Sequence, residues 1–316
     1  MELFKESLLY VFLFLIFPGF LFSIVIGLIS SWIDRKVTAM VQWRKGPPLF
    51  QPFYDILKLW GKETTIPANG SPTVFLIAPI IGLIGITIVS TILWYTNIYK
   101  QSFIGDLIVV IYLLTLPSLS IIIGGSASGN PLASIGASRE IKLLLAYELP
   151  FILSIVTVIL KAGGSIKLTE ISSSTITPTV SGIISLIVVM LCIQAKLGFT
   201  PFDIAEAETE IMSGPFIEYS GPPLSIFKIT QALMLFTLPV FVITLFLGGF
   251  NFTGINILWS ILKYVLILVV IIVIKNTNPR VRIDQAVKFF WRYCATLSLI
   301  ALILAIIGNL YNISWL

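Results

Sequence analysis

The sequence predicts an all-α, polytopic integral membrane protein with about eight transmembrane helices. Hydrophobic residues make up 57% of its 316 residues and charged residues only 11%, whereas charged residues make up roughly 25% of an ordinary soluble domain. At about 20 residues per span, a chain of this length crosses a bilayer roughly 7 to 9 times. The apolar stretches do not alternate as barrel strands do, so each is predicted to be a helix.

Eight apolar stretches are the predicted spans. The first is longer than a signal peptide and has no small-residue cleavage site, so we assign it to the mature chain. We expect residues 1–316 to form a single membrane domain. The predicted spans are 7–33, 73–97, 104–123, 140–160, 180–198, 225–248, 256–274 and 294–313.

The cations are distributed unevenly between the loops. The loops after the odd-numbered spans, with their borders, hold 15 of the 20 Lys and Arg residues. The positive-inside rule therefore places these loops in the cytoplasm and both termini outside the cell membrane. The 15 residues are Arg35, Lys36, Arg44, Lys45, Lys58, Lys62, Arg139, Lys142, Lys196, Lys228, Lys275, Arg280, Arg282, Lys288 and Arg292.

The composition excludes several kinds of chemistry. The chain has no histidine, which rules out His-ligated haem or zinc and catalysis by Ser-His or Cys-His pairs. Cys192 and Cys294 lie far apart in apolar runs and are too few for an iron–sulfur cluster. We therefore expect no cofactor in this chain. The net charge of +5 reports membrane orientation and does not indicate a nucleic-acid partner.

Four cytoplasmic loops, 34–72, 124–139, 199–224 and 275–293, are predicted to form a docking face. In the first, residues 50–60 predict a short amphipathic helix with Pro52 in its first turn. Its polar side carries Asp55 and Lys58. The helix lies in the lipid headgroups or forms one wall of a partner interface, and the sequence leaves both open.

The loop after the fifth span is acidic. Thr200 is predicted to cap a helix that starts at Pro201, which would place several carboxylates on one face. Phenylalanine and isoleucine residues are interleaved with these carboxylates, so we expect a partly buried cluster paired with Arg and Lys rather than a solvated acidic surface. The acidic residues are Asp203, Glu206, Glu208, Glu210 and Glu218.

Further charges lie at or inside the predicted spans. Glu140 can sit at the membrane interface, but Glu148 lies about 12 Å further along the same helix face. A carboxylate at that depth must be neutral, paired or hydrated, so we interpret Glu148 as a proton or ion relay group, with a structural ion pair as the alternative. Lys263 has the same two interpretations, or its side chain reaches out to the membrane surface.

A cytoplasmic turn carries three further charges, Arg280, Arg282 and Asp284. The two arginines are either membrane anchors or counter-ions of the acidic loop, and the sequence leaves both open.

These segments resemble, in order and over nearly the whole chain, the membrane subunit shared by respiratory complex I and the membrane-bound nickel–iron hydrogenases. This family is called subunit 1, or the H-type subunit, of NADH:quinone oxidoreductase. The resemblance rests on Asp34-Arg-Lys, Gln42-Trp-Arg-Lys-Gly-Pro-Pro48, Gln51-Pro-Phe-Tyr-Asp-Ile-Leu-Lys58, Ala146-Tyr-Glu-Leu149, Thr200-Pro-Phe-Asp-Ile-Ala-Glu-Ala-Glu-Thr-Glu210, Glu218-Tyr-Ser-Gly221 and Pro279-Arg-Val-Arg-Ile-Asp-Gln285.

One departure from the family pattern is informative. Gly46-Pro-Pro runs almost directly into Leu49-Phe-Gln-Pro, so the first loop is shorter than in quinone-reducing members. This resembles the branch with the archaeal membrane-bound hydrogenase, its sulfane-sulfur-reducing relative and formate hydrogenlyase. A shorter loop leaves less wall around a quinone headgroup.

The resemblance implies a non-catalytic subunit of a ferredoxin-linked oxidoreductase complex that couples electron transfer to H⁺ or Na⁺ movement. Iron–sulfur clusters and a nickel–iron site would belong to the partners. These are a hydrogenase-like large subunit, an iron–sulfur small subunit, and antiporter-like and small membrane subunits. The resemblance also implies that Glu140, Glu148 and the acidic loop take part in the proton or ion relay. Counter-charge or docking roles fall to Arg35, Lys36, Arg44, Asp55, Lys58, Arg139, Arg280, Arg282 and Asp284.

Two other functions remain as alternatives. The chain could be the quinone-binding subunit of a true NADH:quinone oxidoreductase. It could also be a secondary transporter, but the Pro-to-Gly spacings in 115–125 and 237–249 differ, which is weak support for repeated broken helices. The terminal electron acceptor, and the choice between H⁺ and Na⁺, are not determined by this chain.

Overall fold

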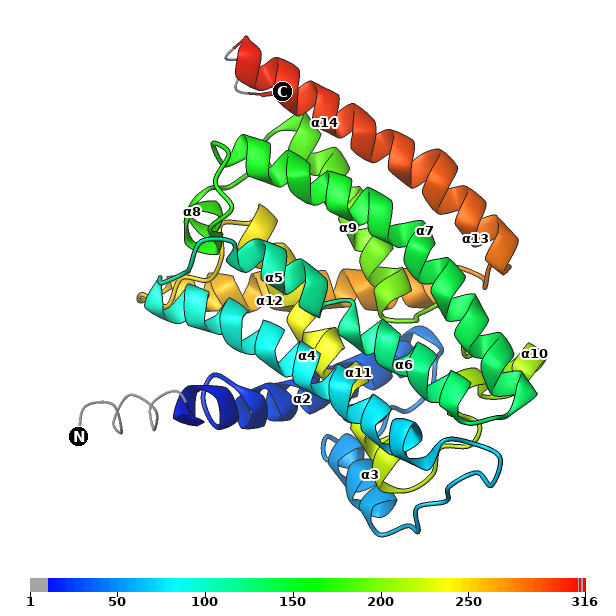
Figure 1. The fold of residues 1–316 in the computed structure, drawn as a ribbon. Helices are drawn as coiled ribbons and strands as arrows, with labels where there is room; N and C mark the ends of the chain where they lie inside the picture. Colours follow the sequence, from blue (N-terminus) through cyan, green and yellow to red (C-terminus); the bar gives the residue numbers. More distant parts are fainter. Residues whose placement is uncertain (1–10, 312, 314) are drawn as a thin grey trace. The chain divides into compact units, whose positions relative to one another are not determined.

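The computed structural model describes residues 11–311, 313, 315 and 316, apart from the side chains of Glu208 and Thr209. These residues are mainly helical, and their only β-type pairing is an isolated bridge between Thr175 and Leu247. Within this part of the chain, seven helices are long and apolar enough to cross a membrane; Figure 1 shows their arrangement along the chain. The protein is therefore an all-α, multi-pass membrane protein, as the sequence predicts.

Seven of the predicted spans correspond to long helical segments. They are Val11–Val41 with a break before α2 (Phe20–Val41), α4 (Pro72–Tyr99), Asp106–Ala127, α7 (Pro131–Lys161), α11 (Pro222–Phe246), α12 (Asn256–Thr277) and Ile283–Leu310. The fifth predicted span is α9 (Val180–Lys196), an apolar helix of only 17 residues. The beginning of the first predicted span, residues 7–10, lies outside the described residues.

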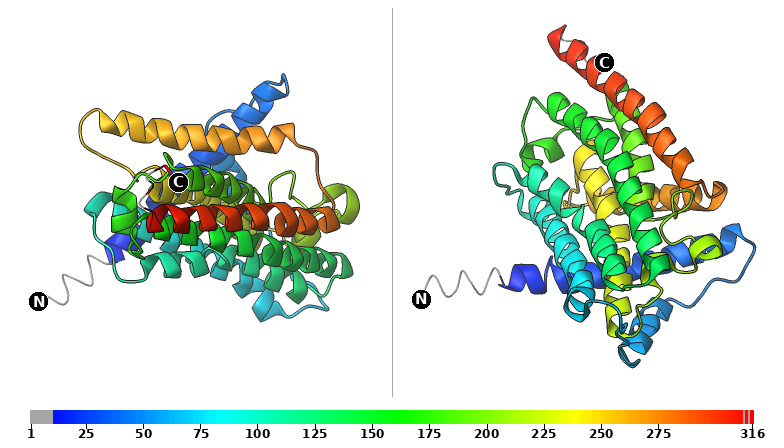
Figure 2. Two further views of the ribbon diagram at one scale, coloured as in Figure 1. Left: turned by 90° about the horizontal axis from the view of Figure 1, so that it is seen from above. Right: turned by 45° about the vertical axis from the view of Figure 1, so that its right-hand side comes forward.

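Several predicted boundaries are wrong. The predicted loop 275–293 is largely helical, because α13 (Ile283–Phe289), a π-helical turn (Phe290–Cys294) and α14 (Ala295–Leu310) follow one another without interruption (Figure 2). The predicted loop 124–139 is likewise shortened, since α7 already begins at Pro131. These helix ends carry polar residues on their exposed sides, and for this reason the sequence analysis predicted them as loops.

Proline breaks one span. The predicted span 104–123 consists of α5 (Asp106–Leu113) and α6 (Leu116–Ala127), with Pro117 in the first turn of α6. Proline lacks the N–H that a continuous helix would need there, so a new helix begins instead.

The chain divides into two compact units, each built from separate segments of sequence. Within the described residues, the first comprises 11–95, 109–137 and 206–238, and the second comprises 96–108, 138–205, 239–311, 313 and 315–316. The short elements are α3 (Gln51–Trp60), α10 (Glu208–Ile211) and a 3₁₀ turn (Gly214–Phe216) in the first unit, and α8 (Leu168–Ser173) in the second.

An aromatic cluster holds the first unit together. The ring of Tyr219 stacks on Phe75 with centroids 3.9 Å apart, and its hydroxyl donates a hydrogen bond to the Phe75 carbonyl at 2.9 Å. A Cβ at Gly124 would lie 2.4 Å from this hydroxyl, so the close packing of α6 on Tyr219 requires glycine. Burial raises the pKa of the Tyr219 hydroxyl, which keeps this donor protonated.

In the second unit, α9 packs against α14 and also contacts α12 (Figure 1). The Gln194 side chain on α9 donates to the Ile271 carbonyl of α12 at 2.8 Å. Phe151 on α7 stacks on Phe241 of α11, and Tyr147 packs edge-on against Phe290. Helices α7, α9, α12 and α14 thus belong to one helical layer, which contains the buried charged residues Glu140 and Lys196.

Candidate functional site

A deeply buried ion pair joins α7 and α9 in the second unit. The Lys196 ammonium lies 2.9 Å from Glu148 Oε2, and the side chains are 0% and 19% exposed, respectively. The rings of Tyr147 and Phe151 flank the ammonium, with centroids 4.9 and 4.7 Å away. Isolated charges in such a setting cost several kcal/mol, so each member of this pair depends on the other.

This pair has an incomplete set of hydrogen bonds. Glu148 Oε1 is buried and has no hydrogen-bond partner among the described residues. The Lys196 ammonium donates to Oε2 alone, so Oε1 keeps its capacity to accept a hydrogen bond. A second, open oxygen provides a place for a further proton donor, so this arrangement is chemically able to pass a proton on.

A second ion pair lies between the acidic loop and the turn after α12. Arg280 binds Asp203 through two parallel hydrogen bonds, from Nε and Nη2, each 2.5 Å long. The backbone N–H of Val281 donates to the Pro201 carbonyl at 3.0 Å, which fixes the two segments side by side. Bidentate arginine–carboxylate bonds are among the stronger polar contacts in proteins.

Of the two alternatives for this turn, Arg280 is thus a counter-ion of the acidic loop, but Arg282 differs. Its side chain is exposed and forms no ion pair with a described residue. Arg282 immediately precedes α13, and its backbone N–H donates to the Gln285 side chain at 3.3 Å. Asp284 is also exposed.

The start of the acidic loop does not form the predicted helix. Residues 201–207 are irregular, and the following α10 has only four residues. Thr200 does not cap a helix there: its hydroxyl donates to the Lys275 carbonyl of α12, and Pro201 and Asp203 bond to Val281 and Arg280. Asp203 therefore does not share a helix face with Glu206 and Glu210.

The acidic residues of the first unit have varied surroundings. Glu218 accepts a hydrogen bond from Asn130 at 2.6 Å, so its partner among the described residues is an amide and not the predicted cation. Glu206 accepts from Gln231 at 2.9 Å, and Glu210 is exposed. The predicted role of Glu208 rests on a side chain outside the described residues.

Near the start of α7, Arg139 and Glu140 are held inside the second unit. Arg139 donates to the Ile204 carbonyl at 3.5 Å. Glu140 is only 6% exposed. Lys263 on α12 donates to the Leu247 carbonyl at 2.8 Å, just after the end of α11. This contact uses the ammonium to satisfy a helix terminus.

In the first unit, an exposed ion pair joins α2 to α3. Arg35 Nη1 lies 2.6 Å from Asp55 Oδ2, and Gln51 donates to the other oxygen at 2.9 Å. Partial burial raises the pKa of Asp55, but the hydrogen bonds from Arg35 and Gln51 outweigh it and hold the pKa below its ordinary value. Lys58 and Arg44 are exposed, and Lys36 packs against Gly46.

Sequence reasoning assigned no role to Lys196 beyond orientation. It is the last residue of α9, so it resembled an ordinary membrane-surface cation, and its partner is 48 positions away. Sequence reasoning also missed Asp106. This residue is fully buried, and its carboxylate accepts backbone hydrogen bonds from Leu107 and Leu168. Within the described residues, no cluster of three or more Cys, Asp or Glu could hold a metal ion.

The fold and these ion pairs define a multi-pass membrane protein with paired charges inside its helical layer. The sequence pattern of the NADH dehydrogenase family matches residues 12–306. The chain is 32% identical to the H-type subunit of the NADH-quinone oxidoreductase of Geobacillus kaustophilus over 301 residues, covering 90% of each chain. It is also 32% identical to the same subunit of Dehalococcoides mccartyi over 295 residues, covering 90% of this chain and 82% of the relative.

The chain therefore belongs to the NADH dehydrogenase family, in agreement with the resemblance inferred from its motifs. A solved structure is also similar, with a TM-score of 0.83 and 29% identity over 96% of this chain and 100% of the other. It is a chain of the membrane-bound sulfane sulfur reductase, an archaeal respiratory membrane complex.

Proposed function

We propose that this chain is the membrane-anchor and energy-coupling subunit of a multisubunit, ion-pumping respiratory complex. The observation that carries the proposal is the Glu148–Lys196 pair, with its buried, open carboxylate oxygen. Charges inside membrane helices are costly and usually mark ion pathways. In this role Glu148 holds or releases a proton as redox chemistry in a neighbouring subunit changes its electrostatic surroundings.

Two observations favour a hydrogenase-type or sulfane-reductase-type complex. The first loop is short between Gly46 and Gln51, and the similar structure with a TM-score of 0.83 belongs to a sulfane sulfur reductase. The similarity to the H-type subunits of NADH-quinone oxidoreductases supports the second candidate, a quinone-binding subunit. Mass spectrometry of the copurified complex separates them. The first candidate predicts a hydrogenase-like large subunit, and the second predicts NADH-oxidising subunits.

We further propose that the polar segments of the chain face the cytoplasm, with both termini outside. There they dock a peripheral arm formed by the large subunit and the iron–sulfur small subunit. The redox centres lie in that arm, and antiporter-like and small membrane subunits adjoin this chain within the bilayer. The unequal distribution of Lys and Arg supports this orientation.

Replacement of Glu148 tests the coupling role. Glu148→Gln is expected to abolish uptake of H⁺ or Na⁺ by inverted vesicles, normalised to assembled complex, and to slow electron transfer. Glu148→Asp is expected to keep part of the activity, because a carboxylate remains at this position. Glu170→Gln is the matched control, since Glu170 forms an exposed ion pair with Lys167 at 3.4 Å. Wild-type uptake by an assembled Glu148→Gln complex would overturn the coupling role.

A further inference from the structure

Two buried serine hydroxyls in the second unit have no described hydrogen-bond partner. Ser154 on α7 and Ser185 on α9 are both fully buried, and the Oγ atom of each lacks a donor or acceptor among the described residues. A buried hydroxyl with no hydrogen bond costs about 1–3 kcal/mol. Two such groups in one helical layer require a physical explanation.

The register of α7 and α9 places these serines opposite each other. The two helices are antiparallel and contact where the Cys192 thiol donates to the Tyr147 carbonyl at 3.6 Å. Two turns on from Tyr147 is Ser154, and two turns back from Cys192 is Ser185. Seven residues bring a helix back to nearly the same face and advance it by about 10.5 Å. Both hydroxyls therefore reach the same level on the facing sides of the two helices.

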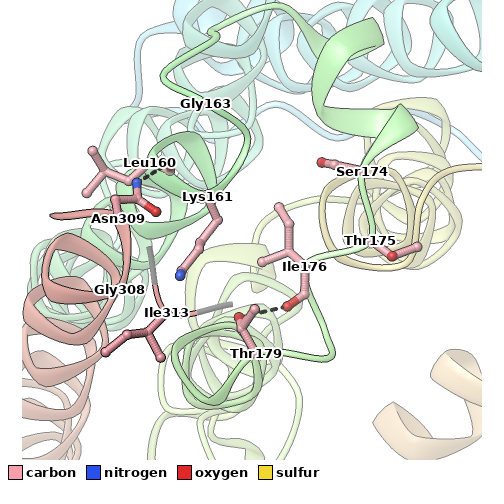
Figure 3. A pocket seen from close by; sticks show the side chains of 10 residues that line it. All are labelled: Leu160, Lys161, Gly163, Ser174, Thr175, Ile176, Thr179, Gly308, Asn309 and Ile313. Atoms are coloured by element: carbon pink, nitrogen blue, oxygen red, sulfur yellow. Dashed lines mark hydrogen bonds between the residues drawn. The ribbon is translucent and has the colours of Figure 1, made fainter. Parts of the chain in front are cut away.

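Two further helical turns beyond the serines, both helices reach a pocket. On α7 this step reaches Lys161, and on α9 it reaches the start of the helix at Thr179. A pocket of about 440 Å³ lies here, and Figure 3 shows the Lys161 side chain extending into it toward Ile313 and Thr179. Lys161 has no ion pair with a described residue.

The α7–α9 interface thus has polar groups at three levels, separated by about 10 Å each. They are the Glu148–Lys196 pair, the Ser154–Ser185 level and the Lys161 pocket. Between the first two levels, Phe151 and Val188 are apolar and fully buried. Between the serines and the pocket, the buried hydroxyls of Thr157 and Ser181 already donate to carbonyls, of Leu153 and Leu316, whereas those of Ser154 and Ser185 have no described partner.

We propose that the α7–α9 interface binds water between Ser154 and Ser185, and that this water is reached from the Lys161 pocket. A water molecule can donate to one hydroxyl and accept from the other, and so satisfy both. Its role rests on the proposed function: it is a station for protons between the Glu148–Lys196 pair and the far end of α7. In each hop one O–H or N–H bond breaks as the next forms, so one proton enters and one leaves.

Cysteine reactivity measures this hydration directly. Ser154→Cys and Ser185→Cys are introduced singly into the full complex in native membranes, with Cys192 and Cys294 replaced by alanine. The probe is 2-aminoethyl methanethiosulfonate, which reacts with hydrated thiolates. Ile155→Cys and Met190→Cys are the matched controls, because both residues are buried and point away from the serines: Ile155 lies about 100° from Ser154 around α7, and Met190 about 140° from Ser185 around α9.

The two cysteines at the serine positions are expected to react at least tenfold faster than both controls. Attachment of a bulky maleimide at Lys161→Cys is expected to slow the reaction at Ser185→Cys, because it closes the pocket. Equal rates at all four positions would overturn the water site. Rapid reaction that a blocked pocket does not slow would overturn the route through Lys161.

The proton role has a separate test. The double variant Ser154→Ala/Ser185→Ala removes the hydroxyls with little change in volume, and it is expected to lower ion uptake per electron at least fivefold. Ser298→Ala on α14 is the control, since this buried hydroxyl already bonds to the Ala295 carbonyl at 2.9 Å. Unchanged uptake in the double variant would overturn the proton station. The cysteine rates require no redox reaction, so failure of the proposed function would leave their outcome unaffected.

Discussion

The ion pairs Glu148–Lys196 and Arg35–Asp55 have similar lengths, 2.9 and 2.6 Å, but very different surroundings. The first is buried between aromatic rings. The second is about two-fifths exposed, and an amide hydrogen bond from Gln51 helps to hold it. Distance alone therefore says little about what a pair contributes. Water weakens an exposed pair, whereas a buried pair makes each charge dependent on its partner.

The largest expected effect is that of removing Lys196. Lys196→Met leaves the Glu148 carboxylate buried without its ammonium, and loss of one partner of a buried pair typically costs about 3–5 kcal/mol. We expect low assembly yield and a lower thermal unfolding temperature of the purified complex. The double variant Lys196→Met/Glu148→Gln should recover part of this stability, since no charge remains buried. If both variants are equally unstable, the two charges do not depend on each other.

An intermediate effect is expected at the partly buried Asp203–Arg280 pair. Arg280→Gln removes two charge-assisted hydrogen bonds, each worth about 1.5–3 kcal/mol in comparable settings, although partial exposure reduces this. Arg282→Gln is the matched control, and it should change stability by less than about 0.5 kcal/mol. Limited proteolysis of segment 199–207 compares the two variants. Equal protection in both would contradict a structural role for the pair.

A small effect is expected for Asp55→Asn. The side chain of Asp55 is 36% exposed, and exposed pairs contribute about 0–1 kcal/mol. The variant should therefore assemble normally, and any loss of activity would arise from docking of a partner on α3. Electron transfer per assembled complex is the measurement. A loss of stability as large as that of Lys196→Met would contradict the contrast between the two pairs.

The smallest expected effect is a dependence on pH. The pKa of Asp55 is lower in the folded chain than in the unfolded chain, so its contribution is present above the unfolded value and is lost as pH falls through the folded value. Protease cleavage near α3 should increase in the wild type as the pH falls below about 4. Asp55→Asn should show no such increase. If cleavage increased equally in the wild type and in Asp55→Asn, the pH dependence would come from groups other than Asp55.

Sequence reasoning predicted the helices better than the contacts between them. A membrane helix satisfies its own backbone hydrogen bonds, so each apolar stretch reveals itself locally. The pairing of Glu148 with Lys196 depends on how α7 and α9 pack, which no local pattern encodes. The predicted helix at Pro201 was wrong for a similar reason: residues 200–203 bond to Lys275, Arg280 and Val281, which lie far along the chain.

The short length of α9 has a consequence for the surrounding lipid. Its 17 residues span about 25 Å, less than the roughly 30 Å of hydrocarbon in a typical bilayer. Val180, Ile183 and Ile187 on this helix are exposed. Where they meet acyl chains, a bilayer of ordinary thickness must thin locally, at a modest cost for each ångström. The acyl-chain length of the host membrane therefore sets the hydrophobic mismatch at α9, the helix that carries Lys196.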